Sequence, residues 1–264
     1  MVESINTLGR FCGKRDVESL DISSLKEKYG IERADVMVLF GGSILAGGDV
    51  LGKAIHDGIA ATYIIVGGAG HTTDTLRQIV HLEYPSIETA GLTEAEIFQR
   101  YLKAEYGCQA DYLETKSTNC GNNITNLLSL LHENHIRCRN IILCQDATMQ
   151  ARMDAGMRKY APDSVRIINY AAYAATVGCN DSGLSYTENI HGMWEIDRYI
   201  ELLMGEIPRL TDDKNGYGPE GRQFIAHVDI PDNVKSAFEK LKVSYGGRIR
   251  EANPLYASDR GDKK

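Results

Sequence analysis

The sequence predicts an α/β fold: a Rossmann-like parallel sheet flanked by helices, with an N-terminal helical segment and a C-terminal helix-plus-loop addition. Three observations lead to this prediction. Short apolar runs alternate along the chain with longer segments of helical periodicity. The apolar runs are nearly continuous, which is typical of strands that are buried on both faces of a parallel sheet. Small or polar residues follow the runs, where each strand would turn into a helix.

Five strands are expected, each a run of apolar and β-branched residues. They are "DVMVLF" (35–40), "TYIIV" (62–66), "DYLET" (111–115), "NIILCQ" (140–145) and "VRIIN" (165–169). The expected helices are 49–60, 72–82, 93–106, 121–135 and 148–159. Repeated strand–helix–strand order gives parallel strands that are joined by right-handed crossovers.

The 264 residues are expected to form a single domain, because no internal repeat and no Pro/Ser-rich linker divides them. Its Rossmann-like core spans about 33–172. Residues 1–30 are expected to be helical and to end at Gly30, a suitable C-cap. The addition, 190–264, contains an amphipathic helix in "GMWEIDRYIELLMG", then a long stretch of little periodicity. The apolar "FIAHV" indicates that this stretch returns to the core as an ordered loop.

Composition and charge exclude several classes of protein. The net charge is −7, which argues against a nucleic-acid groove, since that needs a clustered positive face. No apolar stretch approaches the roughly 20 residues of a membrane span, and the N-terminus lacks the apolar region of a signal peptide. The six cysteines form no CxxC pair. We therefore expect a cytoplasmic protein with reduced thiols, whose partner is a small molecule; its oligomeric state is left open.

Four strand ends form the candidate ligand site. They read "GGSILAGG", "GGAGHTT", "KSTNCGNN" and "DATMQAR", and each leads into a helix. In an open parallel sheet, ligands bind beyond the carboxyl ends of the strands, where the strand order reverses. Helix N-termini there offer N–H groups and a partial positive charge. The pattern predicts a nucleoside-type ligand, with a phosphate compound as the alternative.

Each glycine or capping motif also has a purely structural explanation. "GGSIL" and "GGAGH" match neither GxGxxG nor the P-loop pattern. Tight turns alone would explain Gly67, Gly68 and Gly70. Helix capping alone would explain Ser117 and Asn119, and it does not exclude ligand binding.

The charged residues near the strand ends have similar alternatives. Glu114 and Asp146 stand where a carboxylate commonly takes the hydroxyls of a ribose, although either would serve equally well in a salt bridge or a cap. Arg152 is expected to pair with a ligand carboxylate or with Glu94, or to lie on the surface. His71 follows the glycines directly and would act as an acid or base near neutral pH, or as a hydrogen-bonding spacer.

The hydrolase alternative finds little support in the motifs. Ser43 follows a strand, but the nucleophile elbow G-x-S-x-G would need glycine where Leu45 stands. No cysteine is followed six residues later by arginine, as a cysteine phosphatase requires. No HExxH or close carboxylate cluster suggests a metal site. The sequence therefore identifies no catalytic residue and no metal ligand.

Four stretches carry a resemblance to a known family: "STNCG", "QDATMQAR", "WEIDRYIELLMGEIPRL" and "GYGPEGRQFIAHVDIP". With them the chain resembles, over nearly its whole length, the YdcF proteins of a domain family of unknown function that includes SanA and ElyC. The resemblance implies a Rossmann-like fold with a helical addition and binding of S-adenosylmethionine. SanA and ElyC resemble membrane-anchored envelope proteins, whose roles are not carried over to a chain without the anchor. The wider family tends to have a histidine where this chain reads "QDATMQAR".

The function hypothesis combines the pattern at the strand ends with the family resemblance. We expect a protein that binds S-adenosylmethionine and acts as a methyltransferase on an unidentified acceptor. The alternatives are a hydrolase or phosphoryl-handling enzyme for a small anionic substrate, and a non-enzymatic ligand sensor. Trp194 is expected in the core as part of the amphipathic helix, or on the partner surface of a sensor. The candidate ligand-binding residues are Gly41, Gly42, Ser43, Gly67, Gly68, Gly70, His71, Glu94, Ser117, Asn119, Asp146 and Arg152.

Overall fold

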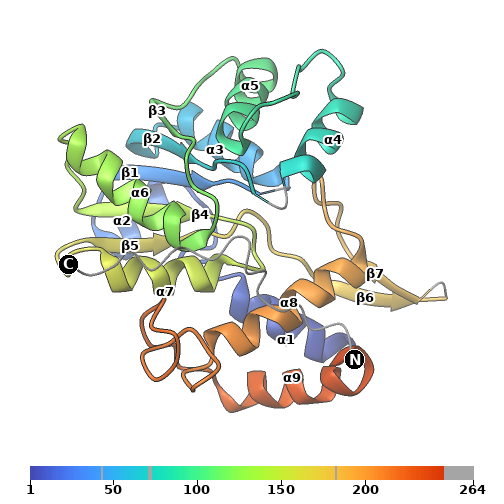
Figure 1. Cartoon of the computed structure of the whole chain (residues 1–264). Helices are drawn as coiled ribbons and strands as arrows, with labels where there is room; N and C mark the ends of the chain where they lie inside the picture. The colour runs from blue at the N-terminus through green and yellow to red at the C-terminus, as the bar shows by residue number, and fades with distance from the viewer. Residues whose placement is uncertain (43, 71–72, 182, 247–264) are drawn as a thin grey trace.

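A five-stranded parallel sheet lies at the centre of the molecule, with strand order β3-β2-β1-β4-β5 (Figure 1). The computed structural model describes residues 1–42, 44–70, 73–181 and 183–246. β1 pairs with β2 on one side and with β4 on the other, so the strand order reverses at β1. This arrangement confirms the predicted Rossmann-like fold.

All five predicted strands form, with ends that differ from the predicted ones by one or two residues. They are β1 (Ala34–Phe40), β2 (Ala60–Val66), β3 (Tyr112–Glu114), β4 (Asn140–Cys144) and β5 (Arg166–Asn169). The predicted helices between them also form, as α3 (Ala46–His56), α4 (Thr73–Glu83), α5 (Glu94–Tyr106), α6 (Cys120–Glu133) and α7 (Gln150–Tyr160). Thr93 caps α5 in a reciprocal box with Glu96, and Asn119 caps α6.

Both faces of the sheet are covered, which explains why the strands are almost continuously apolar. On one face, Val36 and Val38 of β1 pack in the same apolar cluster as residues of α6 and α7. On the other face, Met37 and Leu39 share a cluster with α3 and α5. Successive side chains of a strand point to opposite faces, so a strand between two helical layers needs apolar residues at every position.

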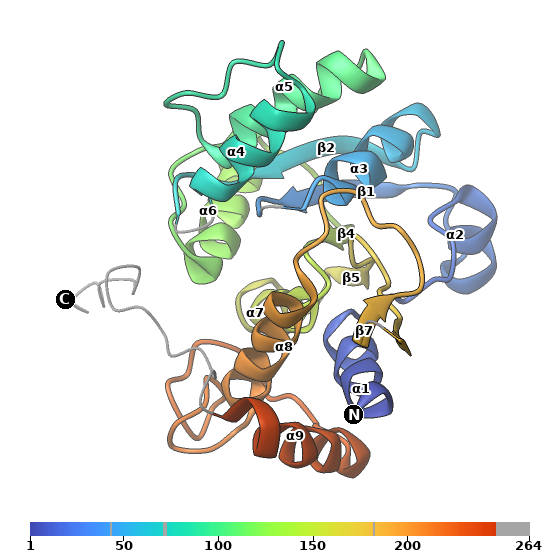
Figure 2. The ribbon, with the colours of Figure 1, turned by 90° about the vertical axis from the view of Figure 1, so that its right-hand side faces the viewer.

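The N-terminal helix and the last two described helices form a third layer. α1 (Val2–Cys12), α8 (Ile196–Leu210) and α9 (Asp232–Tyr245) pack against one another below the sheet in the views of Figures 1 and 2. α2 (Ile22–Tyr29) ends at Gly30, whose φ of 68° is left-handed, as a glycine C-cap requires.

Two elements lie outside the sequence prediction. α9 follows the long loop, and a hairpin of β6 (Val177–Asn180) and β7 (Gly183–Tyr186) precedes α8. The hairpin strands, "VGCN" and "GLSY", are short and carry few apolar residues, so they give no strand signal. The segment between β7 and α8 rises to α4 and returns (Figure 1).

The loop between α8 and α9 is packed against α7. Ala226 N–H donates to the carbonyl of Ala155 at 2.9 Å, and Ile225 is buried. Arg158 Nη1 donates to the carbonyl of His227 at 3.0 Å. The apolar "FIAHV" therefore returns to the core as the sequence indicates, and it lies along the half of α7 that runs away from the carboxyl ends of the strands.

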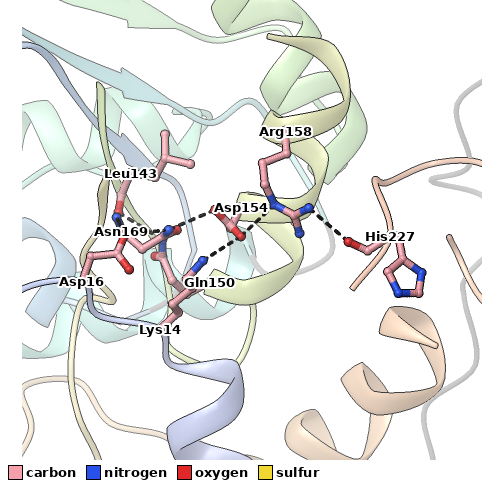
Figure 3. Close-up of polar contacts among 8 residues, drawn as sticks. All are labelled: Lys14, Asp16, Leu143, Gln150, Asp154, Arg158, Asn169 and His227. Carbon is pink, nitrogen blue, oxygen red and sulfur yellow. Dashed lines mark hydrogen bonds and ion pairs between the residues drawn. The ribbon is translucent and has the colours of Figure 1, made fainter. Parts of the chain in front are cut away.

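Asp154 of α7 holds the N-terminal segment, β5 and α7 together (Figure 3). Its Oδ2 accepts from Lys14 Nζ at 3.0 Å and from Arg158 Nε at 3.2 Å, while Oδ1 accepts from Asn169 Nδ2 at 2.9 Å. Asn169 also donates to Asp16, and Gln150 Nε2 donates to Asn169 Oδ1 at 3.0 Å. Asp154 and Asn169 are buried, so the bond between them is shielded from water, whereas Lys14 and Arg158 reach Asp154 from partly exposed positions.

We predict that Asp154→Ala lowers the free energy of unfolding by about 1–3 kcal/mol, because it leaves the buried amide of Asn169 short of an acceptor. Urea denaturation measures the change. The matched control is Asp163→Ala, which alters an exposed aspartate and should stay within about 0.5 kcal/mol of the parent. Equal effects of the two substitutions would show that the network does not stabilise the fold.

Candidate functional site

The reversal of strand order places the candidate site between the ends of β1 and β4. Gly41 and Gly42 follow β1, Gln145 and Asp146 follow β4, and Gln145 Nε2 donates to the carbonyl of Gly41 at 3.3 Å. A cavity of about 10 Å³ lies here, with Gly42, Gln145 and Asp146 in its wall. That is space for about one water molecule. A nucleoside would therefore have to lie outside this cavity, against the loops that follow the strands.

Three of the candidate glycines are required by packing. A Cβ at Gly41 or at Gly67 would press on the side chain of Glu94, and one at Gly68 would overlap the carbonyl oxygen of Ser117. The ends of β1, β2 and β3 approach so closely that side chains do not fit between them. At these three positions, close packing explains the glycine without any ligand.

Gly42 and Gly70 are different, because an added Cβ would make only ordinary van der Waals contacts there. The nearest atom to a Cβ at Gly42 would be Gln145 Oε1 at 3.5 Å, and at Gly70 it would be the carbonyl oxygen of Thr118 at 3.6 Å. The backbone is thus open to close approach at these two turns. Ser43 and His71, which follow them, lie outside the described residues.

Glu94 places a carboxylate directly beside the ends of β1 and β2. It is the first residue of α5 and is only 7% exposed, and Thr73 Oγ1 donates to its Oε1 at 3.0 Å. Its backbone N–H donates to the carbonyl of Gly68 at 3.1 Å. The N-terminus of α5 favours the negative charge at this position.

Asp146 is engaged by the protein's own donors. Its Oδ1 accepts from the N–H and the hydroxyl of Thr148, both at 2.8 Å, and from Tyr173 Oη at 2.7 Å. Its Oδ2 accepts from Trp194 Nε1 at 2.8 Å. Burial, and then the charge of Asp146, raise the pKa of Tyr173, so the phenol stays a neutral donor. Asp146 therefore acts in this structure as a junction between β4 and the segment before α8.

The other acid considered for a ribose, Glu114, braces the turn into α6. Its Oε1 accepts from the backbone N–H of Lys116 at 2.7 Å and of Ser117 at 3.1 Å, and from Asn126 Nδ2 at 3.0 Å. These hydrogen bonds explain the carboxylate of Glu114 without any ligand.

Arg152 pairs with Glu206 and not, as one prediction had it, with Glu94. The pair is bidentate, with Nε to Oε2 at 2.6 Å and Nη2 to Oε1 at 2.9 Å, and both side chains are mostly buried. Burial alone would lower the pKa of Arg152, but neighbouring Cys120 and Glu206 raise it, so the guanidinium stays charged. The pair joins α7 to α8, and the sequence gives no sign of a partner so far along the chain.

Ser117 and Asn119 both serve the turn into α6. Ser117 Oγ accepts from Gly68 N–H at 3.1 Å, and Asn119 Oδ1 accepts from Asn122 N–H at 3.0 Å. Cys120 follows in the first turn. Burial raises the pKa of its thiol, Arg152 lowers it in part, and Glu206 opposes Arg152. The protonated thiol that results is a weak nucleophile.

A histidine that the sequence analysis did not single out joins three segments near this edge. His191 Nδ1 lies 2.8 Å from Asp49 Oδ2 on α3, and Nε2 lies 2.8 Å from Glu83 Oε2 on α4. Tyr101 and Tyr106 donate to Asp49 Oδ1, and Tyr84 lies beside the ring. Burial alone would lower the pKa of His191, but the hydrogen bonds to both carboxylates raise it above the ordinary value. The partners are far apart along the chain, so no local pattern could reveal them.

No model of a known protein family matches the chain. In the part of the chain that the structure describes, no three His, Cys, Asp or Glu side chains gather closely enough to hold a metal ion. Within the same residues, no helix combines the length and the apolar character that crossing a membrane requires.

We predict that Gly68→Ala destabilises the protein by about 1–3 kcal/mol, since the added methyl overlaps a backbone carbonyl that cannot move freely. Gly70→Ala, two residues away, should change the free energy of unfolding by less than about 0.5 kcal/mol. Urea denaturation of both variants compares the cost of an added methyl group at a crowded glycine with its cost at a less crowded one. A tolerated Gly68→Ala would mean that the strand ends are less tightly packed than the structure indicates.

A second prediction concerns pH. Because the pKa of His191 is raised by folding, its stabilising contribution is complete below the unfolded pKa of about 6.5 and is lost as pH rises through the folded pKa. His191→Gln should therefore cost more stability at about pH 6 than at about pH 9. Urea denaturation of parent and variant at both pH values measures this difference. His81→Gln, on an exposed site of α4, is the control, and a pH-independent cost for His191→Gln would contradict the assignment.

Proposed function

We propose that the protein binds a nucleoside-type ligand, with S-adenosylmethionine as the first candidate, at the carboxyl ends of β1, β2 and β4. The observation that carries the proposal is the reversal of strand order at β1 next to Gly42, where a Cβ would fit without a clash. The resemblance to YdcF proteins supports S-adenosylmethionine in particular. A cytoplasmic location belongs to the same proposal and rests on the sequence.

The proposal assigns the residues as follows. Gly42 and Gly70 permit close approach of the ligand to the backbone. Glu94 takes the ribose hydroxyls, because its carboxylate lies at the start of α5 beside the ends of β1 and β2. A carboxylate beside the end of a parallel strand is well placed for that role.

Two further groups complete the assignment. The N-terminus of α6, which Asn119 caps, provides partial positive charge for the amino-acid carboxylate of the ligand. Arg152 does not bind the ligand in this assignment, because Glu206 already neutralises its charge. It supports the site by joining α7 to α8. Methyl transfer is the enzymatic extension of this proposal, since it needs little more than alignment of an acceptor with the sulfonium.

The test is thermal unfolding with and without S-adenosylmethionine, with ATP, NAD and inorganic phosphate as comparisons. At 100 times its dissociation constant a ligand adds about 2.7 kcal/mol, which for a chain of this size raises the midpoint by roughly 5–10 °C. Glu94→Gln should reduce the shift by half or more, with each shift measured from the variant's own midpoint without ligand. Glu105→Gln, at an exposed position of the same helix, is the matched control and should keep the full shift.

Two outcomes would overturn the proposal. One is the absence of any shift at millimolar S-adenosylmethionine. The other is a larger shift with ATP or inorganic phosphate, which would favour the phosphoryl-handling alternative.

A further inference from the structure

A second, larger hollow shares none of its described lining residues with the 10 Å³ cavity. It is an open groove of about 470 Å³ between the end of α4, strand β7 and the segment that links β7 to α8. Its walls include Glu83, Tyr186, Ile190, Met193, Trp194 and Glu195. The volume falls within the range of small-molecule sites, about 300–1,000 Å³.

The indole of Trp194 is held rigidly in the wall of this groove. It precedes α8 instead of lying within it, so the sequence expectation of a core position in the helix was wrong. Its Nε1 donates to Asp146 Oδ2 at 2.8 Å, and its backbone carbonyl accepts from Tyr186 Oη at 3.0 Å. Bonds at both ends fix the residue before any ligand arrives, which lowers the entropic cost of binding.

The charge of the groove is negative. Glu83 and Glu195 are the charged side chains among its described lining residues, and no Lys, Arg or His stands with them there. Glu83 shares its carboxylate with His191, whereas Glu195 is exposed. Aromatic rings beside a carboxylate such as that of Glu195 attract organic cations through cation–π and Coulomb interactions. The bond from the indole N–H to the Asp146 carboxylate makes the ring more electron-rich, which strengthens that attraction.

We propose that this groove binds a small quaternary ammonium cation, with Trp194 and Tyr186 as its aromatic wall and Glu195 as its counter-charge. A methylated cation suits the site better than a metal ion does, because the walls combine apolar side chains such as Ile190 and Met193 with the carboxylates. The groove and its residues differ from those assigned to the nucleoside-type ligand, so this inference does not depend on the proposed function.

Trp194 is the only tryptophan of the chain, so its fluorescence reports directly on the groove. The experiment titrates the full chain with choline and with 3,3-dimethylbutan-1-ol, the uncharged molecule of the same shape. Choline should give a saturable change in fluorescence, and the alcohol should bind about 5- to 30-fold more weakly, since it lacks the charge. Equal affinity for the two molecules, or no saturable change with choline, would overturn the proposal.

Variants locate the binding. Glu195→Gln should weaken choline binding about two- to fivefold, as expected for an exposed charge. Glu188→Gln, at an exposed position outside the described lining, makes the same charge change and should leave the affinity unaltered. Equal weakening by both would mean that choline responds only to the general charge of the protein, and would contradict the site.

A third variant separates the two proposals. Glu94→Gln should reduce the thermal shift with S-adenosylmethionine and leave the choline titration unchanged, because Glu94 is no part of the groove. Loss of choline binding in Glu94→Gln would count against a separate cation site. Failure of the S-adenosylmethionine shift alone would leave the groove assignment in place.

Discussion

The buried carboxylate of Asp154 is the constraint on which the arrangement of the layers depends. It accepts from Lys14 near the N-terminus, from Asn169 at the end of β5 and from Arg158 on its own helix. Arg158 in turn donates to the carbonyl of His227 in the loop before α9. A buried carboxylate without donors is costly, so all these segments must be in place together. Asp154 therefore ties the segment after α1 to β5 and α7, and it adds to the apolar packing and the Arg152–Glu206 pair that hold the helical layer against the sheet.

α8 and the residues just before it provide partners for two charged side chains near the carboxyl ends of the strands. Glu206 of α8 neutralises Arg152 at the start of α7, and Trp194 just before α8 occupies one oxygen of Asp146. An unpaired guanidinium at the position of Arg152 would cost several kcal/mol. The C-terminal addition is thus part of the candidate site, because it satisfies two of the charges that the strand ends carry.

Local sequence was enough to predict the strands, the helices between them and the Gly30 cap, because periodicity and turn residues act within a few positions. It placed ten described candidate residues at strand ends or at the helix starts beside them. It could not predict their partners. His191 bonds to Asp49 across 142 positions and Arg152 to Glu206 across 54, and only the folded chain brings them together. The hairpin of β6 and β7 was missed because its strands carry too few apolar residues to form a pattern.

The glycines illustrate why composition at a strand end does not by itself indicate a ligand. Gly41, Gly67 and Gly68 follow strands just as Gly42 and Gly70 do, yet a Cβ would collide with its neighbours at the first three and make only ordinary contacts at the last two. What separates the two groups is the position of Glu94 and Ser117, which lie 27 to 53 residues further along the chain than the glycines they crowd. Asp146 adds a physical connection, since it lines the small cavity beside Gly42 and also fixes Trp194 in the larger groove. Any ligand that displaced the indole would leave a buried carboxylate oxygen without its donor, so the structure favours ligands that bind with Trp194 in its present place.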